Sequence, residues 1–485
     1  MIRRNLVYTS LGEAASKAVI FILFVYLAKR LGPLDYGYFS LAITFYLMGR
    51  TLSLNSLDMH GIRLISNLKE KTEISRVLLS INTIRLFFAV AASITLTAAI
   101  LILYDDPKVR WICIGFTLCF IPSTFINEWF FNGLQLMIYS MLAQAGLWSI
   151  FMAFVLLAAN ITETFYFYLP AAFFISVALV ALAMHLFIHK LVGRFRYSFD
   201  FKETKSIFLD TGYINLVNIF GYLINFVGIF VLSFSKNSSE LGYYAVALQI
   251  CTMLIIGGSI TYRVTLPHLN TVYKASEGAF IKKFEFVTKF LGFAAVLGVF
   301  YLISYGKAFI TAFWGAGYLA VVPIISMLSF TVFFGYFMMG FSQGLFILGK
   351  DKLLMKIYLF QMALTSALTA LLFKYFGLMG AAAALSLSYF AGFIVFMVNF
   401  YRVRPFEYRH AVKELVSGGL LISAVYWLFS GNIPAVLALI FPVIYLAVCV
   451  LLKVLSPSDL RIIFPRRSAG ASASVMKTNG ERDEI

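Results

Sequence analysis

The sequence predicts an all-α integral membrane protein with about fourteen transmembrane helices. Two observations lead to this class. Apolar residues make up 61% of the 485 positions and charged residues only 13%, whereas a soluble domain carries roughly 25% charged residues. The apolar residues also occur in runs that match the roughly 20 helical residues needed to cross a bilayer. The length of the chain therefore indicates how many transmembrane helices it forms, not how many soluble domains.

The first apolar run follows Met-Ile-Arg-Arg directly and continues to about Leu31. It is too long for the apolar region of a signal peptide and it lacks a cleavage site, so we expect a permanent first helix. Charges, glycine and proline separate the runs that follow. The expected helices are 6–30, 36–57, 77–103, 110–132, 137–159, 166–189, 207–234, 240–265, 286–309, 319–348, 353–375, 379–401, 411–430 and 434–455.

Positive charges gather on one side of this arrangement. With the N-terminus in the cytoplasm, the outer connections hold seven basic residues: Lys29, Arg30, Lys108, Arg110, Lys236, Lys307 and Lys374. Three more, Lys17, Arg50 and Arg85, lie deep within helices, and the other 29 of the 39 lie in inner connections or at the inner ends of helices. This bias predicts that both termini are cytoplasmic and that the helix number is even. It also accounts for the net charge of +17 without a nucleic-acid partner.

A short internal repeat divides the chain. Residues 37–42, Gly-Tyr-Phe-Ser-Leu-Ala, match residues 242–247, Gly-Tyr-Tyr-Ala-Val-Ala, and each segment opens a helix after a short outer loop. Six helices per repeat would give both halves the same orientation in the membrane. The expected parts are an N-lobe (1–189, helices 1–6), a basic cytoplasmic linker (190–206), a C-lobe (207–405, helices 7–12), helices 13–14 (406–455) and a cytoplasmic, disordered tail (456–485).

Ionisable residues inside the predicted helices need partners or a water-filled cavity, because each costs roughly 2.5 to 3.5 kcal/mol at the bilayer centre. Glu13 and Lys17 are four residues apart and could neutralise each other along one helix. Arg50 has no acid within four residues, so it pairs with another helix or faces a cavity. We expect Arg85 to snorkel to the headgroups. Glu128 and Asp210 are candidate partners for either arginine.

A cavity shared by Lys17 and Arg50 would be cationic and suited to a phosphate or an acidic sugar. Amides on the facing helices would add polar contacts: Asn215, Asn218, Asn225 and Gln249. Such amides are also common as hydrogen-bonding groups between membrane helices. The residues predicted to bind substrate are therefore Lys17, Arg50, Glu13, Arg85, Asn215, Asn218 and Gln249.

No group of residues predicts catalysis. The five histidines, His60, His185, His189, His268 and His410, are scattered at helix ends and loops and form no metal-ligand pair. Asp105 and Asp106 could be imagined as the carboxylates of a membrane glycosyltransferase, but they lie in a short solvated loop. We expect a transporter without a cofactor rather than an enzyme, with its site between the helices.

Several segments resemble the polysaccharide transporters, the O-antigen and lipid-linked oligosaccharide flippases of the multidrug/oligosaccharidyl-lipid/polysaccharide exporter superfamily. The first block is Asn5, then Ala-Lys-Arg-Leu-Gly-Pro at 28–33 and Tyr-Gly at 36–37. The later blocks follow in the family's order: 61–63 Gly-Ile-Arg, 317–318 Gly-Tyr, 323–325 Pro-Ile-Ile, 348–350 Leu-Gly-Lys and 377–382 Gly-Leu-Met-Gly-Ala-Ala. The similarity spans helices 1 to 12.

The resemblance implies two six-helix lobes around a central cavity that opens alternately to each side of a bacterial inner membrane. It implies an undecaprenyl-pyrophosphate-linked oligosaccharide as substrate, the repeat unit of an O-antigen, capsule or exopolysaccharide. Members carry cations in the N-lobe cavity, and Lys17 and Arg50 match such positions. The related lipid II flippases also have a basic residue early in helix 8, where the nearest polar residue here is Gln249. Candidate partners are membrane lipid, a glycan polymerase and the chain-length machinery.

Two other functions compete with this interpretation. A cation-coupled drug antiporter of the same fold would need a membrane-embedded carboxylate, for which Glu13 and Asp210 are available, although the basic excess favours an anionic substrate. A membrane glycosyltransferase or glycan polymerase usually needs a substantial outer loop, and none is predicted. The coupling ion, H⁺ or Na⁺, is not indicated by the sequence.

Overall fold

The computed structural model describes residues 2–53, 57–66, 68, 70–162, 164–193, 212–235, 239–405, 409–429, 433–434 and 436–454. Within these ranges every regular element is helical, which confirms the all-α class. The expected tail, and the expected linker beyond Gly193, lie outside the described residues. So does Asp210.

Two long elements each contain a pair of the expected helices. Element α1 (Ile2–Leu52) is broken at Gly32, whose φ of 72° suits a residue without a side chain, and Pro33 follows directly. Element α14 (Asp351–Val403) is broken in the same way at Gly377, with φ 54°. At 1.5 Å per residue, the 53 residues of α14 would extend about 80 Å if straight, so the bend returns the chain across the same layer.

The remaining long helices follow the expected runs. They are α3 (Lys71–Leu103), α7 (Met137–Ile161), α8 (Leu169–Val192), α10 (Gly212–Leu232), α11 (Ser239–Ala275), α12 (Glu277–Phe313), α13 (Val321–Ile347), α15 (Arg409–Leu428) and α16 (Val436–Leu451). Two short 3₁₀ helices, η1 (Phe165–Tyr168) and η2 (Ala316–Tyr318), precede α8 and α13. Eight segments of the described chain are long and apolar enough to cross a membrane, the bent α14 being one of them.

The structure differs from the expected helices in two places. The fourth expected helix is divided into α4 (Pro107–Leu118), α5 (Phe120–Ser123) and α6 (Glu128–Gly133). Pro122 lies at this division, where it has no backbone N–H to continue the ladder. The short helix α2 (Leu57–Ile65) occupies a segment expected to be a connection.

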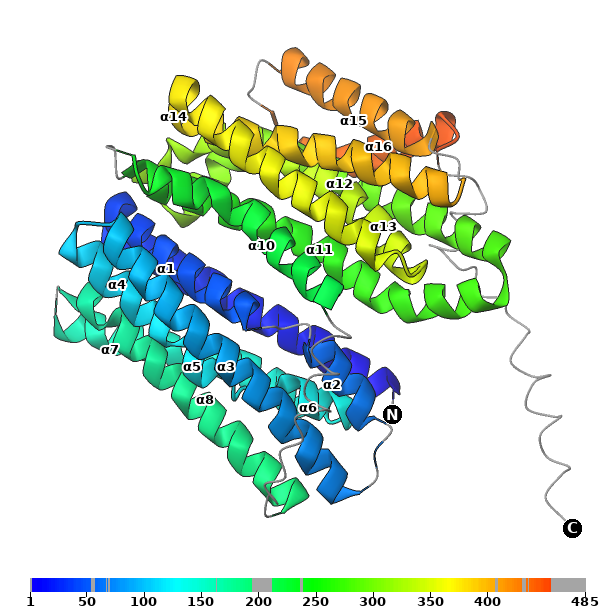
Figure 1. The fold of residues 1–485 in the computed structure, drawn as a ribbon. Helices are drawn as coiled ribbons and strands as arrows, with labels where there is room; N and C mark the ends of the chain where they lie inside the picture. Colours follow the sequence, from blue (N-terminus) through cyan, green and yellow to red (C-terminus); the bar gives the residue numbers. More distant parts are fainter. Residues whose placement is uncertain are drawn as a thin grey trace, which may run out of the picture.

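The helices form two bundles that lie side by side (Figure 1). The first bundle contains α1–α8 and the second contains α10–α14, and α1 joins them through its contacts with α10 and α11. Helices α15 and α16 lie on the outside of the second bundle, against α12. Two hydroxyls hold the start of α16 to α12: Tyr301 Oη donates to the Ala438 carbonyl at 2.6 Å, and Tyr305 Oη donates to the Pro434 carbonyl at 2.9 Å.

The bundles approach most closely where α1 crosses α11, at the two glycines of the sequence repeat. A Cβ added to Gly242 would overlap the Pro33 carbonyl oxygen, and one added to Gly37 would lie 2.9 Å from the Gly242 nitrogen. Only residues without side chains permit this backbone-to-backbone contact. The matching segments of the repeat therefore pack on each other, close to the break at Gly32.

Polar and aromatic contacts surround this crossing. Tyr36 Oη donates to Gln249 Oε1 at 2.8 Å, Tyr104 Oη and Ser233 Oγ share a hydrogen bond of 2.6 Å, and Tyr318 Oη donates to the Ala28 carbonyl at 2.7 Å. The Tyr104 ring also stacks on Phe234 with centroids 5.3 Å apart. We call this region, with the crossing at its centre, the Gly32 end of the molecule, and the bundles are closed on each other there.

We predict that Gly242→Ala weakens this closure, because the new methyl group would overlap the Pro33 carbonyl. Overpacking of this kind costs about 1 to 3 kcal/mol, roughly a fivefold to hundredfold change in an equilibrium. The measurement is the yield of a short bifunctional thiol cross-linker between cysteines placed at Tyr104 and Ser233. The natural cysteines are buried and should react little.

Gly419→Ala is the matched control, because a Cβ at Gly419 has no atom within 4 Å. An unchanged cross-linking yield in Gly242→Ala, with normal elution of the protein on size exclusion, would contradict the predicted closure.

Candidate functional site

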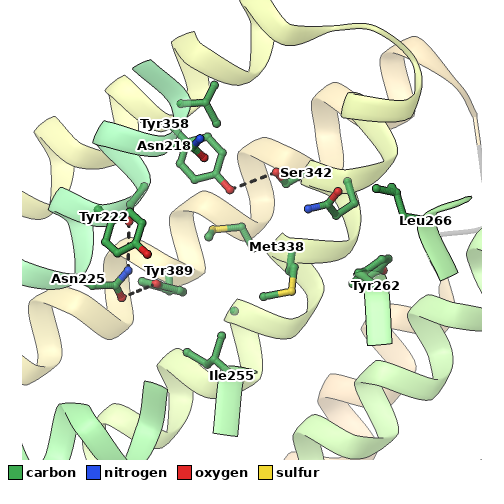
Figure 2. A pocket seen from close by; sticks show the side chains of 15 residues that line it. Asn218, Tyr222, Asn225, Ile255, Tyr262, Leu266, Met338, Ser342, Tyr358 and Tyr389 are labelled. Carbon is green, nitrogen blue, oxygen red and sulfur yellow. Dashed lines mark hydrogen bonds between the residues drawn. The ribbon is translucent and has the colours of Figure 1, made fainter. Parts of the chain in front are cut away.

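The second bundle contains a cavity of about 420 Å³ between α10, α11, α13 and α14 (Figure 2). Its polar lining consists of amides and hydroxyls: Asn218, Tyr222, Asn225, Tyr262, Ser342, Gln343, Tyr358 and Tyr389. Its apolar lining includes Met338 and Met339, whose flexible side chains adapt to ligands of different shape. The α10 residues that line the cavity, Val217 to Asn225, come before Gly228 and Ser233, which lie at the Gly32 end. The cavity therefore lies toward the opposite end of the molecule.

Hydrogen bonds hold part of this wall in place. Tyr389 Oη donates to Asn225 Oδ1 at 2.7 Å, while Asn225 Nδ2 donates to the Gly221 carbonyl at 3.1 Å. Ser342 and Tyr358 share a hydrogen bond of 3.1 Å between their hydroxyls, as Figure 2 shows. Asn218 has no hydrogen bond of its side chain to any residue in the described ranges. The wall therefore combines fixed hydroxyls with an amide available to a polar ligand.

Arg50 faces this region from the first bundle. It lies in the last turn of α1, is half-buried, and interacts electrostatically with Tyr222 of α10. Tyr222 lines the cavity and also borders a small space against Thr51 and Leu52 of α1. The guanidinium thus lies at the seam, beside one wall of the cavity.

The charge of Arg50 is only loosely compensated. Its Nε is buried without a hydrogen-bond partner, and no carboxylate of the described residues lies within 4 Å. Glu128 and Asp58 interact with it at longer range, and Glu128 itself accepts a hydrogen bond from Gln144 Nε2 at 2.7 Å. Of the two acids expected to be candidate partners, Glu128 is within electrostatic reach of Arg50, and Asp210 lies outside the described residues.

Arg85 has a different environment from the one expected. We expected it to snorkel to the headgroups, but it is 1% exposed. Its Nη1 lies 3.5 Å from Asp58 Oδ1 and 3.5 Å from Asn127 Oδ1. The prediction that Arg85 snorkels is wrong, because α2, a helix that was not expected, places Asp58 beside the arginine. Arg85 holds α3 to α2 in this structure, and its predicted contact with substrate stays a prediction.

The other predicted site residues are distributed along the seam and the helices beside it. Lys17 is exposed on α1. Along the helix it lies about 22 Å before the Gly32 break, and Arg50 lies about 27 Å after the same break. The two cations are therefore at similar depth. The side chain of Glu13 lies outside the described part of the structure, so its pairing with Lys17 stays a prediction.

Two predicted amides do not line the cavity. Asn215 is buried one turn before Asn218 on α10. Gln249 accepts the hydrogen bond of Tyr36 across the bundle seam, and its Nε2 is buried without a hydrogen-bond partner. Gln249 thus belongs to the closed Gly32 end in this conformation, and a role in substrate binding stays a prediction for both residues.

Sequence reasoning missed the tyrosines of the cavity. Tyr222, Tyr262, Tyr358 and Tyr389 lie in apolar runs, where an aromatic residue is usually part of the packing. The sequence does contain a signal for the cavity, because four tyrosines lie in the same group of helices as Asn218 and Asn225. Such a combination of hydroxyls and amides in membrane helices indicates polar contacts within the bundle.

Comparisons with known proteins agree with this architecture. The model of a family described as polysaccharide biosynthesis protein matches residues 2–271. A solved structure of the lipid II flippase MurJ in an inward closed conformation has a TM-score of 0.72 and 13% identity, over 91% of this chain and 98% of that chain. No curated protein sequence matches the chain.

Multidrug transporters share the fold at lower similarity. An inward-facing MATE family transporter of the MOP superfamily has a TM-score of 0.58 and 13% identity, over 86% of this chain and 95% of that chain. An outward-facing MATE family transporter of the same superfamily has a TM-score of 0.56 and 12% identity, over 83% of this chain and 95% of that chain. At these sequence identities the similarity shows a shared fold and nothing more.

We predict that Asp58→Asn destabilises the protein, because it leaves the enclosed Arg85 without its ionic partner. Removing one partner of a fully buried ion pair costs about 3 to 5 kcal/mol, and the cost here should be smaller because the Asp58 side chain is 30% exposed. Thermal unfolding in detergent should show a lower midpoint. Asp105→Asn, which breaks the solvent-exposed pair with Arg110, is the control and should leave the midpoint unchanged. Equal midpoints for the two variants would show that Arg85 does not depend on Asp58.

Proposed function

Because the chain belongs to the family of polysaccharide biosynthesis proteins, we propose that it is a flippase for undecaprenyl-pyrophosphate-linked oligosaccharides. It moves the glycan, a repeat unit of an O-antigen, capsule or exopolysaccharide, from the cytoplasmic to the outer leaflet of the bacterial inner membrane. The activity is transport by alternating access rather than catalysis.

The observation that carries this proposal is Arg50 at the edge of the polar cavity. A pyrophosphate needs compensation of its charge once it leaves water, and an arginine offers two parallel donors to its oxygens. Arg50 has no close carboxylate among the described residues and a buried Nε that lacks a partner. These are the properties of a cation that receives an external anion, with the exposed Lys17 at similar depth as a second charge.

The cavity supplies the complementary contacts for the sugars. Sugar hydroxyls both donate and accept hydrogen bonds, and the amide of Asn218 and the tyrosine hydroxyls around it can do the same. At about 420 Å³, the cavity has the size of a small-ligand site and would hold part of an oligosaccharide. The prenyl chain would remain in lipid, since burying its apolar surface there requires no protein pocket.

The contacts between bundles support an order of events. With both termini in the cytoplasm, the Gly32 end faces outward and is closed, so this conformation receives substrate from the cytoplasmic side. Rocking of the bundles about the crossing at Gly37 and Gly242 would then separate Tyr36 from Gln249. The cavity would open to the outer leaflet, and the coupling ion, H⁺ or Na⁺, would bias the two states.

A cation-coupled drug antiporter is the second candidate. The half-buried carboxylate of Glu128 is the observation in its favour, because such a transporter needs an acid in the membrane. An effect of gene deletion on sensitivity to cationic drugs, with unchanged surface glycan, would favour this alternative.

We predict that Arg50→Glu abolishes glycan export and that Arg50→Ala weakens it, because charge reversal repels the pyrophosphate whereas neutral substitution only removes its partner. Lys17→Glu should act like Arg50→Glu. Export is measured as surface glycan in cells that carry the variant as the sole copy. Arg110→Ala is the matched control, since its arginine lies at the opposite, Gly32 end. Full export by Arg50→Ala would refute the assignment.

A second prediction tests the class of substrate. Deletion of the gene should cause a prenyl-pyrophosphate glycan to accumulate facing the cytoplasm, because its synthesis continues while transport stops. Lipid extraction and mass spectrometry would identify the glycan. Unchanged lipid-linked glycans in the deletion strain would exclude the flippase.

A further inference from the structure

Glu414 is an acid enclosed between packed helices. It lies on α15 and is 0% exposed, and Arg85 is the other acidic or basic side chain of the described residues that is as deeply buried. Arg85 has Asp58 beside it, whereas both carboxylate oxygens of Glu414 are buried without a hydrogen-bond partner. The proposed transport mechanism does not use this group.

The space for this carboxylate is provided by a glycine on the neighbouring helix. A Cβ added to Gly292 of α12 would overlap Glu414 Oε2 and would lie 2.5 Å from the Phe337 ring. One turn further along, a Cβ on Gly418 would lie 2.6 Å from Val296. Helices α12 and α15 therefore pack closely along this seam, with the carboxylate enclosed between Gly292 and apolar side chains.

The groups that face Glu414 come from the two helices packed against α15. Lys289 of α12, one turn before Gly292 and half-buried, interacts with it electrostatically. From α16, Cys449 lies within electrostatic range, and Tyr445 Oη donates to the Glu414 backbone carbonyl at 3.5 Å. On α15 itself, Ser417 Oγ donates to the same carbonyl. These hydroxyls bond the backbone and leave the carboxylate oxygens unpaired.

An ionised carboxylate without hydrogen bonds in an apolar enclosure is costly, and such a group takes up a proton instead. The same group becomes stable as an anion if water or the Lys289 ammonium reaches it. The state of Glu414 therefore depends on how closely α12 and α15 are packed around Gly292.

We propose that Glu414 is a proton-binding site that couples the conformational cycle to protons, an inference that rests on the proposed transport function. In this conformation the side chain is the neutral acid. When α12 and α15 separate at Gly292, the acid releases one proton to water, and its carboxylate is compensated by Lys289. Closure of the seam takes up one proton again, so protonation and packing change together.

The first test is infrared difference spectroscopy of the purified protein in lipid, from neutral to alkaline pH. Wild type minus Glu414→Gln should contain the C=O stretching band of a protonated carboxylic acid at neutral pH. The band should lose amplitude as the pH rises. Glu414→Asp should restore a band, and Lys289→Met should keep the acid protonated to higher pH because it removes the compensating charge.

Glu277→Gln is the matched control, because Glu277 lies at the exposed start of α12 in an ion pair with Arg404 and should contribute no such band. Gly292→Ala should shift or remove the Glu414 band, since the methyl group would displace the carboxylate. Absence of a Glu414-dependent band at neutral pH, in protein that elutes as a single species, would overturn the proposal.

The second test measures coupling. Proteoliposomes containing the protein and a fluorescent undecaprenyl-pyrophosphate disaccharide are given a pH gradient, and flipping is followed by quenching of the label. Wild type should flip faster with the gradient, whereas Glu414→Gln should flip at a rate independent of it. A gradient dependence that persists in Glu414→Gln would overturn the coupling. If wild-type protein fails to flip the probe while the infrared band is present, the proposed substrate fails and the proton site stands.

Discussion

The backbone contact between Gly37 and Gly242 is the constraint on which the arrangement of the bundles depends. Two helices can approach this closely only without side chains at the crossing, and small residues are the usual means of close packing in membranes. The contact places Tyr36 opposite Gln249 and Tyr104 opposite Ser233. The closed end is thus a consequence of this crossing.

Enclosed charges are treated in three different ways in this membrane protein. Arg85 is neutralised by Asp58 on a neighbouring helix and serves packing. Arg50 keeps its carboxylates at longer range and faces a cavity, which suits an external anion. The carboxylate oxygens of Glu414 have no hydrogen-bond partner, which suits a group that binds a proton. The same desolvation cost therefore leads to a structural role for Arg85, to the substrate-binding role proposed for Arg50 and to the proton-binding role proposed for Glu414, according to what lies within reach of each group.

Most helices could be predicted because an apolar run of sufficient length has few alternatives in a membrane. Element α7 (Met137–Ile161) begins at the expected residue, and the breaks at Gly32 and Gly377 separate the expected helix pairs. The candidate site was harder to predict from the sequence. Arg85 was misjudged because its partner, Asp58, lies on α2, a short helix that does not span the membrane and so lacks the apolar signal. Glu414 lies near the start of an expected helix, where an acid normally faces water; only the packing of α15 against Gly292 encloses it.

The attachment of α15 and α16 bears on how the protein is made. These two helices contact α12 and each other, and the start of α16 is hydrogen-bonded to α12 by the hydroxyls of Tyr301 and Tyr305. In the described ranges, neither bundle includes a helix from beyond residue 405. Both bundles can therefore assemble while the ribosome is still translating the last hairpin, which then docks on a finished surface. The Glu414 carboxylate would then reach its place beside Gly292 after the two bundles have formed.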